Sequence, residues 1–286
     1  MILDGKALAA IEREKIREET QKLGIQPGLA VVLVGDDSAS QSYVNSKEKA
    51  CLELGFLSRV MRLPASTPEA ELLQIVMDLN SDKSINGILV QLPLPGHIDE
   101  NLIIDAIDPD KDVDCFHPFN FGRLFIGSQI IEPCTPKGIM RILDHYMIEI
   151  KGKNAVVIGR SNIVGKPAAM LLMQRHATVT IAHSRTVDLP EVCRRADILV
   201  AAVGKPLMVK GDWVKEGAVV IDVGTNRVPD STRPKGYRMV GDVDFAEVEP
   251  KVSAISPVPG GIGPMTIAML MSNTLALAKY AHGIID

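Results

Sequence analysis

The sequence predicts an α/β protein of two domains, for three reasons. A chain of 286 residues is longer than most single domains. Short apolar, β-branched runs alternate with helical stretches, as in parallel sheets that helices cover on both faces. This alternation weakens between residues 108 and 135 and resumes after residue 153. We therefore expect one discontinuous domain in residues 1–138 and 265–286, and a second domain in residues 139–264.

Composition narrows the class of protein. Hydrophobic residues make up 46% of the chain and charged residues 23%, which is enough apolar material for two packed cores. The formal net charge of −4 argues against nucleic acid or an anionic membrane as a partner, because both select a basic face. A small anionic ligand held by a few lysines and arginines is still compatible with this charge.

Cysteine spacing and hydropathy indicate the compartment. The four cysteines include no CxxC pair, so we expect neither a metal site nor a disulfide framework. The N-terminal residues contain no signal-peptide core. Residues 254–278 carry no charge, but Pro257, Pro259 and Pro264 predict a loop and a buried helix rather than a membrane span. We expect a cytoplasmic protein.

Local patterns predict the elements of the first domain. A charged amphipathic stretch that stops before Gly24 predicts a helix over residues 5–23. Thr67-Pro68 predicts a helix start with Thr as N-cap and Pro at the first helical position. The other expected elements are a strand at 29–35, a helix at 38–54 and strands at 58–63 and 87–92.

The second domain repeats the pattern. A helix that starts at Thr135-Pro136 and ends near residue 150 precedes it. The expected elements are a strand at 155–158, a helix at 165–175, a strand at 178–182, a helix at 189–195 and strands at 198–203 and 218–223. The last helix, about residues 265–280, is expected to pack back on the first domain.

The most informative motif is the segment Val156–Pro167. A strand ends at Gly159 and a helix begins at Gly165, so free N–H groups and the positive end of the helix dipole can face a phosphate. The motif departs from GxGxxG, because Ser161 replaces the second glycine and the last glycine is displaced by one residue. A GxSxG nucleophile elbow also fails, because Ile163 replaces its final glycine. From the motif alone, the segment could also be a tight strand–helix turn that binds no ligand.

The following strand favours the nucleotide interpretation. NAD sites usually carry an acid about 20 residues after the glycine turn. This strand instead ends in His183-Ser184-Arg185-Thr186, and an arginine there suits the 2′-phosphate of NADP. Gly204 and Thr225 lie at later strand ends, where doubly wound sheets bind ligands. The candidate cofactor residues are Gly159, Arg160, Ser161, Ile163, Gly165, Ser184, Arg185, Gly204 and Thr225.

Polar residues of the first domain form a second candidate site. Tyr43 and Lys47 lie one turn apart on one face of a predicted helix. Gln91 interrupts an apolar strand, and a buried amide without a partner costs about 1–3 kcal/mol. Asp114 lies in the irregular segment. Taken singly, each is also compatible with an ordinary surface or turn residue.

Six sequence runs, in their order along the chain, resemble the bifunctional methylenetetrahydrofolate dehydrogenase/methenyltetrahydrofolate cyclohydrolase family in its short bacterial form. Each run is modestly specific, but six in order are highly specific. They span nearly the whole chain. The runs are Ser42–Lys47, Val90–Pro95, Lys111–Asp114, Pro133–Pro136, Gly159–Pro167 and Pro257–Thr266.

The resemblance implies a reaction and an architecture. The enzyme would oxidise 5,10-methylenetetrahydrofolate with NADP and hydrolyse the methenyl product to 10-formyltetrahydrofolate. It would be a homodimer, with a folate cleft between an N-terminal α/β substrate domain and a Rossmann-like NADP-binding domain. Two other functions stay open from the residues alone: a monofunctional NADP-dependent dehydrogenase of the same fold, and a noncatalytic NADP-sensing protein.

The resemblance also assigns roles to residues. Tyr43 would stack on the aminobenzoyl ring of folate, Lys47 would be the catalytic lysine assisted by Gln91, and Asp114 would bind the pterin. The remaining folate-binding residues would be Pro259, Gly260 and Gly261. Two positions depart from the family pattern: Cys115 stands where glycine is usual, and Thr225 where isoleucine is usual. Neither departure removes a catalytic group.

Overall fold

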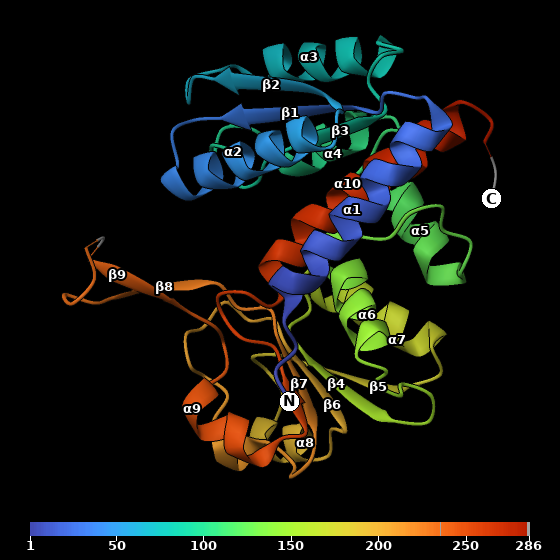
Figure 1. The fold of residues 1–286 in the computed structure, drawn as a ribbon. Coiled ribbons are helices and arrows are strands. Elements are labelled where there is room, and N and C mark those ends of the chain that lie inside the picture. Colours follow the sequence, from blue (N-terminus) through green and yellow to red (C-terminus); the bar gives the residue numbers. More distant parts are fainter. Residues whose placement is uncertain (235, 285–286) are drawn as a thin grey trace. The chain divides into compact units, whose positions relative to one another are not determined.

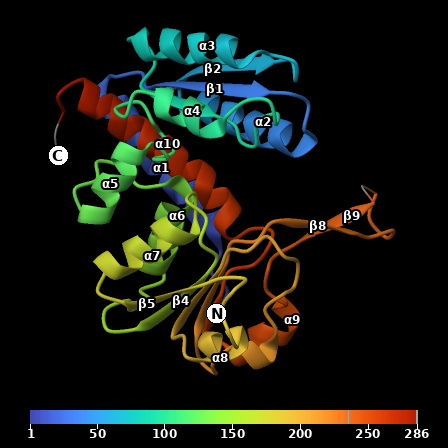
Figure 2. The same ribbon diagram turned by 180° about the vertical axis from the view of Figure 1, so that it is seen from behind.

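The computed structural model describes residues 1–234 and 236–284, which form two compact units. Unit 1 comprises residues 1–10 and 135–266, and unit 2 comprises residues 11–134 with the C-terminal segment from residue 267. Each unit contains a parallel sheet, and Figures 1 and 2 show these sheets from opposite sides. The predicted α/β class with two domains is confirmed.

Unit 2 is built on a three-stranded parallel sheet in the order β2-β1-β3. The central strand β1 (Gly28–Val34) is buried along its whole length, because β2 (Leu57–Leu63) and β3 (Gly87–Val90) flank it. Helices α2 (Ser38–Glu53) and α3 (Glu69–Ser81) lie on opposite sides of this sheet (Figures 1 and 2).

Apolar side chains from strands and helices form the core of unit 2. Val32 and Ile88 pack with Leu72 of α3 and with Ile103 of α4 (Glu100–Ala106). Three helices cross a boundary between the units: α1 (Gly5–Leu23), α6 (Cys134–His145), by its first residue alone, and α10 (Ile262–Ala281). Helix α5 (Pro118–Ile126) lies within unit 2.

Unit 1 is a doubly wound domain with a five-stranded parallel sheet in the order β10-β7-β6-β4-β5. In sequence order this is the 2-1-3-4-5 arrangement, whose crevice for ligands lies beside the first strand, β4, at the carboxyl ends of the strands. The strands are β4 (Asn154–Ile158), β5 (Thr178–Ala182), β6 (Ile198–Ala201), β7 (Val219–Asp222) and β10 (Ala254–Ile255). The helices are α6 (Cys134–His145), α7 (Gly165–Gln174), α8 (Leu189–Arg194) and α9 (Phe245–Val248), with 3-10 turns η1 (Gly211–Trp213) and η2 (Glu249–Lys251).

The first residues of the chain extend the sheet of unit 1. Ile2 forms a parallel bridge with Ile255, and the Leu3 N–H donates to Ile255 O at 2.9 Å. The N-terminal ammonium of Met1 donates to Ser253 O at 2.7 Å. Residues 1–10 therefore group with unit 1, which differs from the division expected from the sequence. The two apolar residues after Met1 give no sign of a partner that lies about 250 positions away.

A two-stranded hairpin leaves unit 1 after β7. Among the described residues, strands β8 (Asn226–Pro229) and β9 (Tyr237–Val240) pair only with each other, and they extend away from the five-stranded sheet (Figures 1 and 2). The Arg227 guanidinium lies 5.0 Å from the centre of the Tyr237 ring, which gives the hairpin one internal cation–π contact.

The N-cap of helix α3 differs from the prediction, and helix α5 was not predicted. Helix α3 begins at Glu69 with Pro68 as its N-cap, so Thr67 does not cap it; the Thr67 hydroxyl donates to Pro64 O at 2.8 Å. Helix α5 lies inside the segment expected to be irregular, with His117 capping its start and Gly127 ending it in the left-handed conformation. No helix in the described part of the chain is long and apolar enough to cross a membrane.

Candidate active site

Helix α2 carries two of the predicted catalytic residues. The Asp37 carboxylate caps the helix by accepting the Ser40 N–H at 2.7 Å. Lys47 is only 8% exposed, and its Nζ donates to Gln91 Oε1 at 2.9 Å. Tyr43, one turn earlier, is 39% exposed and so is accessible to a ligand. The structure brings Lys47 and Gln91 together, as the site prediction requires.

Gln91 follows β3 and is held at three atoms. Its backbone N–H donates to Val32 O at 2.8 Å, which continues the strand pairing past the last residue of β3. Its side-chain Nε2 donates to Leu92 O at 2.8 Å. A flipped amide would turn an NH2 group toward the Lys47 ammonium and lose both side-chain bonds. The oxygen of Gln91 is therefore fixed toward Lys47.

Burial makes Lys47 easier to deprotonate. Desolvation lowers the pKa of Lys47, and the nearby Asp114 and Cys134 oppose this effect by favouring the ammonium. Desolvation raises the pKa of Asp114, against the charge of Lys47 and a hydrogen bond from Cys134. Lys47 and Asp114 therefore interact, and each of them is less inclined to carry its charge than an exposed residue of its type. A lysine of this kind can act in proton transfer.

Two side chains that the sequence prediction omitted support Asp114. Cys134 Sγ lies 3.4 Å from Asp114 Oδ1. Asn273 of α10 is fully buried, and its Nδ2 donates to Glu132 O at 2.7 Å and to Val113 O at 3.0 Å. One amide thus joins the chain segments on which Asp114 and Cys134 lie. The available signal was an asparagine inside an uncharged, apolar helix, where it needs partners.

Cys115 has a conformation that explains the glycine expected at its position. Its φ is 61°, in the left-handed region that favours glycine. The thiol is buried and contacts Ile131 O at 3.7 Å, and burial raises its pKa. The side chain is therefore accommodated next to Asp114 at the cost of an unfavourable backbone conformation.

The second candidate site is a cavity of about 350 Å³ in unit 1. It lies where β4, β5 and β6 end, which is the crevice expected for this strand order. Its lining includes four predicted cofactor residues; Ile163, Gly165, Arg185, Gly204 and Thr225 do not line it. The lining residues are Ile158, Gly159, Arg160, Ser161, His183, Ser184, Leu189, Ala202, Val203, Lys205 and Met208.

Two glycines shape the turn between β4 and α7. A Cβ on Gly159, whose φ is 122°, would lie 2.1 Å from Ala202 O. A Cβ on Gly165 would lie 2.2 Å from Gly159 O. The displaced Gly165 therefore permits the close approach of helix and turn that the last glycine of GxGxxG normally provides. This departure from the pattern leaves its steric function intact.

The expectation of free N–H groups at the start of α7 is wrong. Ser161 Oγ accepts the Val164 and Gly165 N–H groups at 3.2 and 3.3 Å, and Ser161 O accepts the Lys166 N–H at 3.0 Å. Pro167 has no N–H to offer. Ser161 therefore satisfies the N–H groups of Val164, Gly165 and Lys166, and these groups are not free to bind a phosphate. The helix dipole and the adjacent side chains can still attract one.

In the turn after β5, Ser184 lines the cavity and Arg185 does not. The Arg185 N–H donates to His183 Nδ1 at 3.1 Å, and the His183 N–H donates to Thr186 Oγ1 at 2.9 Å. This compact turn presents His183 and Ser184 to the cavity, whereas Arg185 is outside its lining. Among the cations that the sequence prediction named, Arg160 is the one that lines the cavity.

The predicted folate-binding loop belongs to unit 1. The Gly261 N–H donates to Pro257 O at 2.8 Å, and the Lys6 N–H donates to Gly260 O at 2.8 Å. The bond between Val258 and Pro259 is cis. Pro259, Gly260 and Gly261 thus lie in unit 1, whereas Tyr43, Lys47, Gln91 and Asp114 lie in unit 2.

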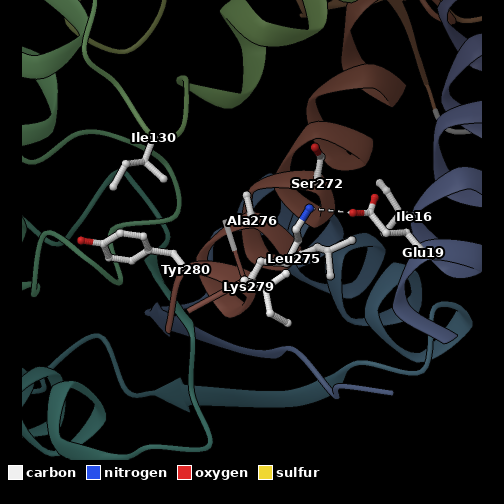
Figure 3. A pocket seen from close by; sticks show the side chains of 9 residues that line it. Ile16, Glu19, Ile130, Ser272, Leu275, Ala276, Lys279 and Tyr280 are labelled. Carbon is white, nitrogen blue, oxygen red and sulfur yellow. Dashed lines mark hydrogen bonds and ion pairs between the residues drawn. The ribbon is translucent and has the colours of Figure 1, made fainter. Parts of the chain in front are cut away.

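A further cavity, of about 420 Å³, lies in unit 2 between α1 and α10 (Figure 3). Its walls are largely apolar, and Lys279 forms an ion pair with Glu19 at 2.9 Å at its edge. It contains none of the predicted site residues. Among residues 1–234 and 236–284, no cluster of three or more His, Cys, Asp or Glu side chains could hold a metal ion.

Two family models match the chain. Residues 3–114 match the catalytic domain of tetrahydrofolate dehydrogenase/cyclohydrolase, and residues 133–282 match the NAD(P)-binding domain of the same enzyme. The bifunctional protein FolD of Pelobacter propionicus is 58% identical over 281 residues, which cover 97% of each chain. The protein of the same name from Moorella thermoacetica is 59% identical and covers 97% of this chain and 98% of its own.

Solved structures are similarly close. The bifunctional FolD methylenetetrahydrofolate dehydrogenase/cyclohydrolase of Campylobacter jejuni has a TM-score of 0.93 and 50% identity, covering 98% of this chain and 99% of its own. The Trypanosoma brucei enzyme, complexed with NADP and an inhibitor, has a TM-score of 0.95 and 42% identity, covering 99% of this chain and 98% of its own.

Proposed function

This chain belongs to the tetrahydrofolate dehydrogenase/cyclohydrolase family, and on that premise we propose how its residues divide the chemistry. The chain is a bifunctional enzyme that oxidises 5,10-methylenetetrahydrofolate with NADP and hydrolyses the methenyl product to 10-formyltetrahydrofolate. The contact between buried Lys47 and Gln91 Oε1 carries the assignment of the hydrolytic step. Relatives of 58–59% identity that are named as bifunctional support this function over a monofunctional dehydrogenase or an NADP sensor.

The dehydrogenase step needs alignment more than it needs acid–base groups. When bound, NADP would supply the acceptor for the hydride that leaves the one-carbon bridge between two folate nitrogens. We assign the NADP site to the cavity at Gly159, because the glycine turn allows a close approach of the backbone and the lining supplies Arg160, Ser161 and Ser184. An arginine and two hydroxyl groups suit phosphate oxygens.

Lys47 serves the hydrolytic step. Water adds its oxygen to the methenyl carbon and gives up a proton, which neutral Lys47 Nζ accepts. The hydroxyl group on that carbon then releases its remaining proton to solvent as the carbonyl bond forms, and the bond from the carbon to N5 breaks. N5 takes the first proton back from Lys47, and the formyl group stays on N10. Gln91 Oε1 orients Nζ throughout. Asp114 accepts hydrogen bonds from the pterin ring N–H and amino group, Tyr43 stacks on the aminobenzoyl ring, and Pro259–Gly261 contribute to folate binding.

The test is Lys47→Met, which keeps the length of the side chain and removes its amine. Methenyl hydrolysis should be lost while the fold and NADP binding survive. The matched control is Lys49→Met on the same helix, where Lys49 is exposed and forms an ion pair only with Glu53 among the described ion pairs. Retained hydrolysis in Lys47→Met would refute the assignment.

We also propose a cytoplasmic homodimer. An isolated two-stranded hairpin is marginally stable in water, and its unpaired edges are open to another chain. The β8–β9 hairpin is such an element, and pairing with a second copy would satisfy it. Light scattering of the whole protein and of a variant with a shortened hairpin tests this: a monomeric variant supports the proposal, and a monomeric parent contradicts it.

A further inference from the structure

Two buried carboxyl groups in unit 1 have no part in the mechanism above. Asp222 is the last residue of β7, and Asp242 follows β9. They are 3% and 0% exposed. A buried carboxylate is costly unless hydrogen bonds satisfy it, so the donors around these two groups indicate what they stabilise.

Asp242 gathers four donors. Its Oδ2 accepts the Val203 and Gly204 N–H groups at 2.6 and 3.0 Å. Its Oδ1 accepts the Lys205 N–H and Asn226 Nδ2, both at 2.9 Å. Three consecutive backbone N–H groups therefore end on one carboxylate. An ionised carboxyl group offers about four acceptor positions, and all are used here.

Asp222 fixes the backbone of Asp242 from the other side. It accepts the Asp242 and Gly224 N–H groups at 2.9 Å and the Val243 N–H at 3.0 Å. A Cβ on Gly241 would lie 1.7 Å from Asp222 Oδ2, and a Cβ on Gly224 would lie 2.4 Å from Asp242 Oδ1. Both carboxyl groups are thus packed directly on glycine backbone, which leaves Asp242 little freedom to move.

The turn that Asp242 holds forms part of the nucleotide cavity. Residues 203–205 follow β6, and both Val203 and Lys205 line the cavity. The next residues are tied to the same segment, because the Val209 N–H donates to Asp242 O at 2.9 Å. The position of this cavity wall therefore depends on a residue that does not line the cavity itself.

We propose that Asp242 is a positioning residue of the NADP site, whose carboxylate holds the 203–205 turn in the conformation that binds the nucleotide. This inference rests on the assignment of NADP to the cavity at Gly159. It adds a residue that touches neither the cofactor nor the reacting atoms and acts through the backbone of the turn.

Asparagine is not a conservative replacement at this position. In Asp242→Asn, one oxygen becomes an NH2 group that still faces two donors. Whichever way the amide turns, either Val203 and Gly204 or Lys205 and Asn226 lose their acceptor. The 203–205 turn must then relax away from residue 242.

The experiment compares the two activities of the full-length protein. In Asp242→Asn, the KM for NADP in the dehydrogenase assay should rise at least about tenfold. The free energy that corresponds to a tenfold change is smaller than the contribution that one charge-assisted hydrogen bond can make. The KM for methylenetetrahydrofolate and the rate of methenyl hydrolysis should be unchanged. The control is Asp197→Asn at the amino end of β6, whose carboxylate accepts the Asn154 N–H at 2.9 Å and pairs with Lys215. It should leave the KM for NADP unchanged.

Each outcome decides between positioning and general stability. An unchanged KM for NADP in Asp242→Asn overturns the proposal, as does a parallel loss of both activities. If Asp242→Asn does not fold, Asn226→Ala removes one donor and should raise the KM for NADP by a smaller factor; no rise overturns the proposal.

A separate variant tests the NADP site itself. Arg160→Glu places a negative charge in the cavity, so the KM for NADP should rise steeply. If it does not rise, the assignment of NADP to this cavity falls, and the positioning role with it. If Arg160→Glu raises this KM and Asp242→Asn does not, only the positioning role falls.

Discussion

The carboxyl group of Asp222 should make the stability of unit 1 decrease as the pH rises from acid to neutral. Burial raises the pKa of Asp222 from its ordinary 3.8 to about 6, and the neighbouring charge of Asp242 adds to this; hydrogen bonds from the Asp242, Val243 and Gly224 N–H groups only partly offset it. The folded protein therefore binds this proton more tightly than the unfolded chain. Most native acids show the opposite behaviour.

The magnitude follows from the two pKa values. At 1.36 kcal/mol for each pH unit, the difference between 3.8 and about 6 corresponds to about 3 kcal/mol. The contribution of Asp222 is fully present below pH 3.8 and is lost as the pH rises through about 6. Asp222→Asn does not titrate, so the stability of the parent should fall by about 3 kcal/mol relative to the variant between pH about 4 and about 7.

The single tryptophan makes this measurable in unit 1. Trp213 packs against the core of that unit, so its fluorescence during urea unfolding follows unit 1. The free energy of unfolding is compared between parent and variant across the pH range. Asp197→Asn is an informative control, because hydrogen bonding to Lys215 lowers the pKa of Asp197 and predicts a pH dependence of the opposite sign. Parallel curves for the parent and Asp222→Asn would refute the reasoning.

Three further outcomes are expected. Arg185→Ala should weaken NADP no more than NAD, because Arg185 is outside the cavity lining whereas Arg160 and Ser184 are part of it; initial rates with both cofactors test this, and a much larger loss with NADP would return the 2′-phosphate contact to Arg185. Gly159→Ala should abolish NADP binding in a calorimetric titration, because its Cβ would meet a carbonyl oxygen at 2.1 Å, and normal binding would contradict that geometry. Asn273→Ala should lower the melting temperature by several degrees, since two carbonyl groups lose a buried donor worth about 1–3 kcal/mol, and an unchanged value would show that water replaces the amide.

Elements with a strong local signal could be predicted from the sequence. Helix α1 has the bounds that its charge pattern and Gly24 indicated, because an amphipathic stretch and a left-handed glycine are local properties. Helix α5 was missed because the segment around it is rich in Pro, Asp, Phe and Gly, which resemble loop composition. Its His117 cap is not a standard N-cap residue.

In the candidate sites, too, the residues that could be predicted are those with a local signal in the sequence. The partners Lys47 and Gln91 stand out, because a glutamine in an apolar strand must find a hydrogen bond. The buried pair Asp222 and Asp242 could not be predicted, since their donors come from turns up to 39 residues away and no local pattern marks them. The first residue of α7 was predicted correctly, but the free N–H groups expected there were not found, because Ser161 can cap the helix as well as bind a ligand.

Both units need residues from each end of the chain, and this affects the order in which they can form during synthesis. The edge of the unit 1 sheet pairs Ile2 with Ile255, and the Asp114 segment of unit 2 is tied by Asn273. A ribosome that adds about 5–20 residues per second must therefore make almost the whole protein before either unit has all its parts. Ile2 and helix α1 have partners that are synthesised late, Ile255 and Lys279 respectively. The nascent chain should acquire its protection against proteolysis late and in both units almost together.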